Sequence, residues 1–296
     1  MRTPRKWPQL PRQLGKAFPR FIFTVLSLAS HSAVAQNLIP SGDFESGPWG
    51  TSEVARQEAE EKNGGDHSLR IVYSAWVVSP ELVEIDPNAV YRLSAQVKRP
   101  ETMQSSDIPE KVTLQLALQM FDADDNPIGG MSVAPVPDTK TRLTADAAEG
   151  SQEVRVEGEP WPRQTLSGGV AYDAIAFDAQ DDYSDLPNHA SYLVNTISAD
   201  ESGTVIRLRK PLEKSYAAGT PVRQHMHAEV PQVSAAASPE WQEHFVEVSG
   251  VSEAGKIDPA KFWPGTKKVQ AAIRAGGSGT NEVELLVDDI TLLEHK

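Results

Sequence analysis

The chain of 296 residues contains no cysteine, so it can form neither disulfides nor a thiolate metal site. Long apolar runs are also lacking. The most apolar stretch, residues 21–28, is much shorter than the roughly 20 residues that a membrane-spanning helix needs. We therefore expect no membrane span, and a fold that is stabilised mainly by its apolar core.

Positive charge is scarce, since 28 Lys and Arg residues stand against 41 Asp and Glu residues and the net charge is -13. Nucleic acids and anionic membranes are bound by clustered Lys and Arg. The composition therefore excludes nucleic acid as a partner. It is compatible with hard cations and with neutral, hydroxyl-rich ligands.

The N-terminal segment is the part of the chain where basic residues stand without acidic ones. Residues 1–20 hold six basic residues and no acidic residue, and they are followed by the apolar stretch and by the small-residue sequence Ala33-Val34-Ala35. This is the order of a secretory signal peptide, with an uncleaved amphipathic anchor as the alternative. We expect cleavage near Ala35 and a secreted protein, extracellular or periplasmic, that comprises residues 36–296.

Short segments of alternating apolar and polar residues, separated by turn residues, fill most of the chain after residue 36. In the clearest example, Leu114, Leu116 and Leu118 fall on one face of a strand, whereas Gln115 and Gln119 fall on the other. Helical periodicity is nearly absent. The pattern predicts an all-β sandwich.

Residues from about 180 to 240 interrupt this pattern. A turn-rich sequence opens the region and an alanine-rich sequence closes it. Between them, residues 204–209 read as a strand and residues 214–223 as a turn that leads into another strand. We expect an insertion in the sandwich that carries a small hairpin. The alternative is a second small domain, although the apolar content of the region is low for an independent core.

Two motifs near the ends of the predicted mature chain resemble a known family. The first is N-L-I-P-S-G-D-F-E from Asn37 to Glu45, and the second is L-L-V-D-D-I-T-L from Leu285 to Leu292; the strand from Val90 to Val97 also matches. Together they resemble the carbohydrate-binding modules of families 4, 9 and 22, which are galactose-binding-like jelly rolls. The resemblance implies a jelly-roll β-sandwich that binds polysaccharide or oligosaccharide, and a separately encoded carbohydrate-active enzyme is a further candidate partner.

The same resemblance implies a structural calcium ion that joins the first and last strands. Carried over by position, its ligands would be Asp43, Glu45, Asp66 and Asp288. Calcium takes six to eight oxygen ligands, so carboxylates and main-chain carbonyls suit it. The alternative is that these residues are ordinary solvated carboxylates at strand ends.

Asp288 is the strongest of these candidates, because strand alternation places it in phase with Ile290 and Leu292. We therefore expect its carboxylate to point inward at the end of the sandwich, where it needs a partner.

Two further patterns resemble metal sites. The run from Asp122 to Asn126 matches the start of a calcium loop but lacks the glycine and the closing glutamate, so it predicts a turn. His225 and His227 would share one face of a strand, but a catalytic zinc ion needs a third ligand that the sequence does not place. Whether this pair binds a metal is left open.

The candidate sugar-binding residues are Trp76, Trp161, Gln96 and Gln115. Aromatic rings can pack on the apolar face of a pyranose, and amide side chains can bond its hydroxyls. The alternatives are core packing for the tryptophans and a solvated strand face for the glutamines.

The sequence favours a protein that is not an enzyme, because it contains no G-x-S-x-G, no H-E-x-x-H and no phosphate-binding glycine loop. The alternatives to sugar binding are a structural or adhesive envelope protein without sugar specificity and, less favoured, a polysaccharide-degrading enzyme.

Overall fold

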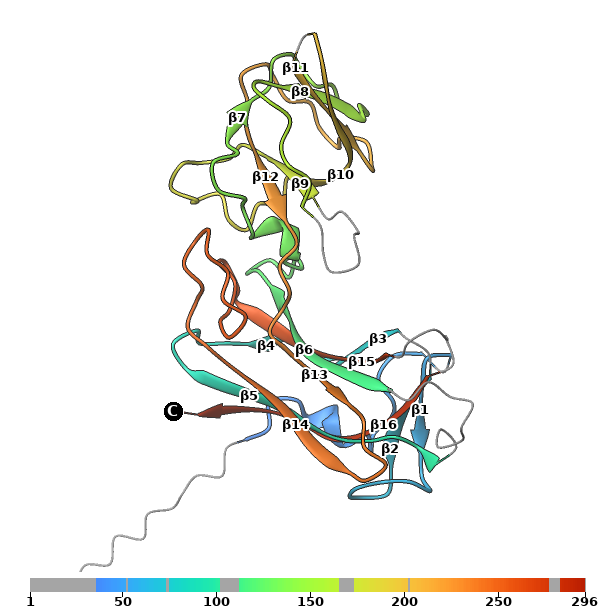
Figure 1. Cartoon of the computed structure of the whole chain (residues 1–296). Helices are drawn as coiled ribbons and strands as arrows, with labels where there is room; N and C mark the ends of the chain where they lie inside the picture. The colour runs from blue at the N-terminus through green and yellow to red at the C-terminus, as the bar shows by residue number, and fades with distance from the viewer. Residues whose placement is uncertain are drawn as a thin grey trace, which may run out of the picture. The chain divides into compact units, whose positions relative to one another are not determined.

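The computed structural model describes residues 36–51, 53–72, 75–101, 112–164, 173–201, 203–276 and 283–295 (Figure 1). The expected signal peptide, residues 1–35, lies outside the described residues. Within the described ranges the chain is almost entirely strand and irregular structure, with short 3₁₀ turns. The prediction of an all-β fold is therefore confirmed.

Two five-stranded sheets form the sandwich. One sheet has the order β1 (Ala55–Glu58), β2 (Ser68–Val72), β16 (Glu284–His295), β5 (Val90–Lys98) and β14 (Gln242–Ser249). The other has the order β13 (Gln232–Ala236), β6 (Thr113–Phe121), β15 (Lys268–Gly276) and β3 (Trp76–Val78), with the short β4 (Val83–Glu84) also paired to β15 (Figure 1).

The sequence alternation explains how these sheets pack. Leu114, Leu116 and Leu118 of β6 are fully buried and share one apolar core with residues of the opposite sheet, such as Leu93 and Val287. The intervening polar residues of β6 therefore lie on the outer face of its sheet.

The opening segment lies against the last strand, as the family resemblance implies. The Leu38 amide donates to the Leu292 carbonyl at 2.9 Å, and the Leu292 amide donates to Asn37 Oδ1 at 2.9 Å. The 3₁₀ turn η1 (Pro40–Asp43) follows, and a Cβ on Gly42 would lie only 2.0 Å from the carbonyl oxygen of Ile290. Glycine is therefore required for this close approach.

A third sheet, with its own apolar core, interrupts the sandwich. Its order is β7 (Thr141–Arg142), β12 (Pro221–Met226), β9 (Asp173–Phe177), β10 (Ser191–Asp200), β11 (Gly203–Leu208) and β8 (Glu153–Val156). Its core includes Phe177 and Tyr216, whose rings stack at 4.0 Å between centroids.

The insertion therefore begins earlier in the sequence than the expected range of 180–240, and it also ends earlier. Strand β8 pairs with β11, and β9 pairs with β10 and β12, so both belong to the third sheet. Strand β13, in contrast, pairs with β6 of the sandwich. Apolar residues from both sides of position 180 build the second core, so the composition of 180–240 alone underestimates it.

Two antiparallel segments, residues 127–136 and 224–231, connect the sandwich to the third sheet; we call them the connecting segments. Backbone bonds join them from the Met226 amide to the Ala134 carbonyl (2.9 Å) and from the Ala228 amide to the Gly130 carbonyl (3.3 Å). The short turn η3 (Gly130–Ser132) lies within the first segment. Nowhere in the described ranges is there a helix long and apolar enough to span a membrane.

Candidate functional site

A groove with a volume of about 580 Å³ lies on the outer face of the sheet that contains β6 and β15. Side chains from all four main strands of this sheet contribute to it: Trp76, Gln115, Ala117, Gln119, Gln232 and Arg274. Ala117 pairs with Ala272 in the middle of the sheet. Two such small neighbours leave room for a hollow between larger polar side chains.

Three side chains from three adjacent strands form the chemical centre of this groove. Trp76, 38% exposed, is opposite Arg274 in the register, and Arg274 is opposite Gln115. The Arg274 guanidinium carbon lies 5.0 Å from the centre of the Trp76 ring, and Nη2 donates to Gln115 Oε1. An apolar ring surface therefore lies beside fixed hydrogen-bonding groups, a combination typical of small-molecule sites.

The connecting segments form one wall of the groove through residues 127–130 and 227–230. Their backbones are in direct contact, because a Cβ on Gly130 would lie 2.1 Å from the carbonyl oxygen of Ala228. On this wall, Glu229 Oε2 accepts a hydrogen bond from Gln232 Nε2 at 3.1 Å.

The four predicted sugar-binding residues do not lie together. Trp76 and Gln115 both line the groove. Gln96 lies on β5, on the outer face of the opposite sheet, and Trp161 is only 8% exposed within the core of the third sheet. Strand alternation shows which side chains point away from the core, but it does not show to which of the two sheets a strand belongs.

Glu45 and Asp288, two of the four predicted calcium ligands, hold the same loop. Glu45 Oε1 accepts the amides of Asp66 (2.8 Å) and His67 (3.0 Å). Asp288 Oδ2 accepts the amides of Asn63 (2.8 Å) and Gly64 (3.1 Å). These backbone donors lower the pKa of Glu45.

Asp43 and Asp66 have other contacts. Asp43 Oδ1 accepts the amide of Glu45 at 3.2 Å, and the Asp66 carbonyl accepts a bond from Lys62 Nζ at 3.2 Å.

Asp288 is buried, but not for the expected reason. Val287 and Ile290 both enter the sandwich core, because the register shifts after Asp288 and Asp289 adopts a left-handed conformation with φ 48°. The bulge moves Asp288 out of phase with Ile290, so the expected inward orientation needs correction: loop 63–64 covers the carboxylate on the other face. Burial raises its pKa, although three backbone amides partly compensate.

The donor set at this place fits calcium only in part. Two carboxylates hold one loop, but the oxygens Glu45 Oε1 and Asp288 Oδ2 already accept two amide hydrogens each. Across the ranges given above, no three acidic or histidine side chains are arranged as metal ligands. Calcium binding here stays a prediction.

The run that resembles a calcium loop is a turn, as predicted. Asp122 Oδ1 accepts the amides of Asp124 and Asn126, both at 2.9 Å, and Oδ2 lies 3.1 Å from His189 Nε2. The carboxylate thus closes the turn itself.

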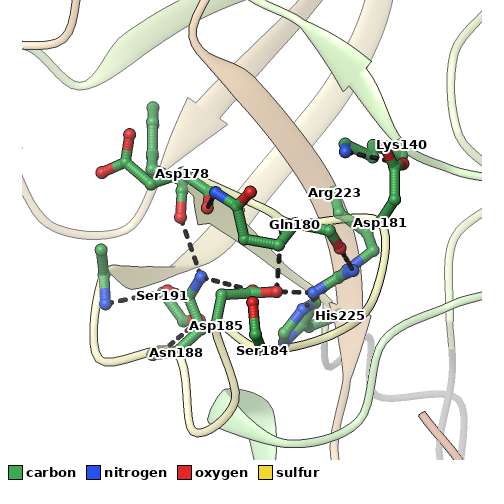
Figure 2. Close-up of polar contacts among 12 residues, drawn as sticks. Lys140, Asp178, Gln180, Asp181, Ser184, Asp185, Asn188, Ser191, Arg223 and His225 are labelled. Atoms are coloured by element: carbon green, nitrogen blue, oxygen red, sulfur yellow. Dashed lines mark hydrogen bonds and ion pairs between the residues drawn. The ribbon is translucent and has the colours of Figure 1, made fainter. Parts of the chain in front are cut away.

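The two histidines of the His225-Met-His227 sequence lie in different surroundings. His227 lines the groove, whereas His225 is fully buried in a polar cluster with Arg223 and Asp185 (Figure 2). Our sequence reading missed this cluster. The available signal was the run of three polar residues from Arg223 to His225 inside a short strand.

Structural likenesses to known proteins include two carbohydrate-binding modules. A family 16 carbohydrate-binding module aligns over 87% of this chain and 99% of its own, with 11% identity and a TM-score of 0.36. TmCBM61, solved with β-1,4-galactotriose, aligns over 88% and 100%, with 9% identity and a TM-score of 0.33. Both TM-scores are below 0.5, and neither name is that of families 4, 9 or 22. No family model and no curated protein matches the chain.

Proposed function

We propose that this chain is a secreted, non-catalytic carbohydrate-binding protein whose ligand lies in the groove beside Trp76. The observation that carries this proposal is the grouping of an exposed indole ring, the Arg274 guanidinium and the Gln115 amide in one hollow. The volume of about 580 Å³ falls in the usual range for small-ligand sites, about 300–1,000 Å³.

The chemistry of the groove matches a saccharide. The face of a pyranose is apolar and packs on an aromatic ring, while its hydroxyls both donate and accept hydrogen bonds. Gln115, Gln119 and Gln232 each carry both a donor and an acceptor, and Arg274 adds further donors. The overall negative charge of the protein is compatible with a neutral ligand of this kind.

The groove also favours binding without catalysis. Hydrolysis of a glycosidic bond commonly uses two carboxylates about 5–10 Å apart. Among the described residues that line the groove, Glu229 is the one carboxylate. A module of this kind would hold polysaccharide, either for a separately encoded carbohydrate-active enzyme or in an extracellular matrix. Secretion through the N-terminal leader and a calcium ion near Glu45 and Asp288 belong to the same proposal.

Affinity electrophoresis and calorimetry with a panel of neutral polysaccharides test the proposal. We expect retardation by one class of polysaccharide and a saturable heat of binding with its oligosaccharides. The same incubations should release no reducing ends and no unsaturated uronate. The absence of binding across the panel would favour an adhesive or structural role, and product release would show an enzyme.

A further inference from the structure

We propose that Arg223, Asp185 and His225 form a positioning cluster that fixes the wall of the groove, although none of the three lines the groove. This inference rests on the proposed function, since it names side chains of the third sheet on which saccharide affinity depends.

The cluster is almost closed to solvent, and Figure 2 shows its polar contacts. Arg223, 3% exposed, forms an ion pair with Asp185 at 2.8 Å (Nη2–Oδ2) and donates from Nη1 to the Gln180 carbonyl at 3.1 Å. The Tyr183 ring lies 4.7 Å from its guanidinium carbon. Asp185 Oδ2 also accepts from Asn188 Nδ2 at 3.0 Å. Each charged group thus has several fixed partners, as a buried ion pair requires.

His225 links this cluster to the first connecting segment. Arg223 Nε lies 3.3 Å from His225 Nε2 and can only donate, so Nε2 is the acceptor. The proton of the neutral ring is therefore on Nδ1, which donates to the Met131 carbonyl at 2.7 Å. Burial lowers the pKa of His225 to about 4, which agrees with a neutral ring at pH 7.

A second bond reaches the same turn from the loop that Asp185 holds. The Asn188 amide donates to the Ser132 carbonyl at 2.8 Å. The carbonyls of Met131 and Ser132, at the end of η3, are therefore both fixed by groups of the third sheet.

Met131 and Ser132 directly follow Gly130, the last residue of the first wall segment. Gly130 lines the groove and contacts the backbone of Ala228, which lines it as well. A shift of η3 would move Gly130 against Ala228 and change the distance between the wall and the sheet. Binding depends steeply on such distances, because ordering a displaced wall costs part of the binding free energy.

The test compares the wild-type protein with His225→Leu, which removes both ring nitrogens, and His225→Gln, which keeps a donor and an acceptor. Asp185→Asn is the second disruptive variant. Val156→Ala is the matched control, because it weakens the core of the third sheet in β8 without touching the cluster. All proteins are compared well below their melting temperatures, on the polysaccharide that the wild type binds.

Two measurements are made on each protein. We expect His225→Leu and Asp185→Asn to weaken saccharide binding about tenfold and to increase hydrogen exchange in peptides that cover residues 127–134 and 226–231. His225→Gln should restore most of both, and Val156→Ala should change neither.

The outcomes separate the two proposals. If the wild type binds no saccharide, the proposed function is wrong. If the wild type binds and His225→Leu and Asp185→Asn bind equally well with unchanged exchange in the wall peptides, the positioning role is wrong. An equal loss of affinity in Val156→Ala would also overturn it, because general destabilisation would then explain the effect.

Discussion

His225 Nδ1 lies 2.7 Å from the carbonyl oxygen of Met131, so a ring of the third sheet holds a backbone turn of the segment that leads to the groove. The sequence separation of 94 residues shows why no local pattern indicates this bond. It gives the buried histidine a structural role that depends on its neutral form.

The first prediction concerns pH. Burial lowers the pKa of His225 from 6.5 to about 4. The charged groups next to the ring are Arg223, which lowers the pKa, and Asp185, which raises it. Between these values the unfolded chain binds more protons, so the free energy of unfolding falls as the pH decreases. Between pH 7 and pH 4.5 we expect the wild type to lose about 2 kcal/mol more than His225→Gln, measured by urea unfolding. Equal losses would show that this ring does not titrate as described.

The second prediction compares two adjacent glycines. Gly130→Ala should destabilise the protein by about 1–3 kcal/mol and weaken saccharide binding, because its Cβ would lie 2.1 Å from the Ala228 carbonyl oxygen. In Gly129→Ala the nearest contact is Ser132 Oγ at 3.8 Å, so this variant serves as the control for stability, although Gly129 also lines the groove. Thermal unfolding and calorimetry measure both effects. Equal losses of stability in the two variants would contradict the wall geometry.

The third prediction concerns calcium. If calcium binds near Glu45 and Asp288, adding it at a hundredfold excess over its Kd should stabilise the protein by about 2.7 kcal/mol relative to chelator. Glu45→Gln and Asp288→Asn should remove this gain. Asp122→Asn is the control, because Asp122 closes a separate turn. A wild-type melting temperature that does not change when calcium is added would contradict calcium binding at this place.

The fourth prediction concerns Trp161, which the structure places in the core of the third sheet at 8% exposure. Trp161→Ala should lower the free energy of unfolding by about 3–5 kcal/mol. Differential scanning calorimetry checks this effect. A fully stable Trp161→Ala protein with weakened sugar binding would instead restore the ligand role that the sequence predicts for this residue.

The sequence predicts the sandwich well because alternation reports burial directly, as Leu114 and Leu116 show. It also indicates the contact between the opening segment and β16, where Asn37 and Leu292 bond to each other. Both features follow from local patterns or from motifs that the family resemblance ties together.

The remaining features depend on tertiary contacts. A bulge reverses the phase between Asp288 and Ile290, and alternation cannot detect it. Gln96 and Gln115 have the same local pattern but lie on opposite sheets. The groove itself needs Trp76 beside Arg274, which are 198 positions apart and meet only through the pairing of β3 with β15.

The most direct test of the sugar-binding proposal is calorimetric titration of Trp76→Ala with the oligosaccharide that the wild type binds. Phe245→Ala is the matched control, because Phe245 is 45% exposed on the opposite sheet and stacks with Arg92 at 3.6 Å. We predict at least a tenfold loss of affinity for Trp76→Ala, an unchanged melting temperature, and wild-type affinity for Phe245→Ala. Wild-type affinity in Trp76→Ala would contradict the proposal that the groove is the saccharide site.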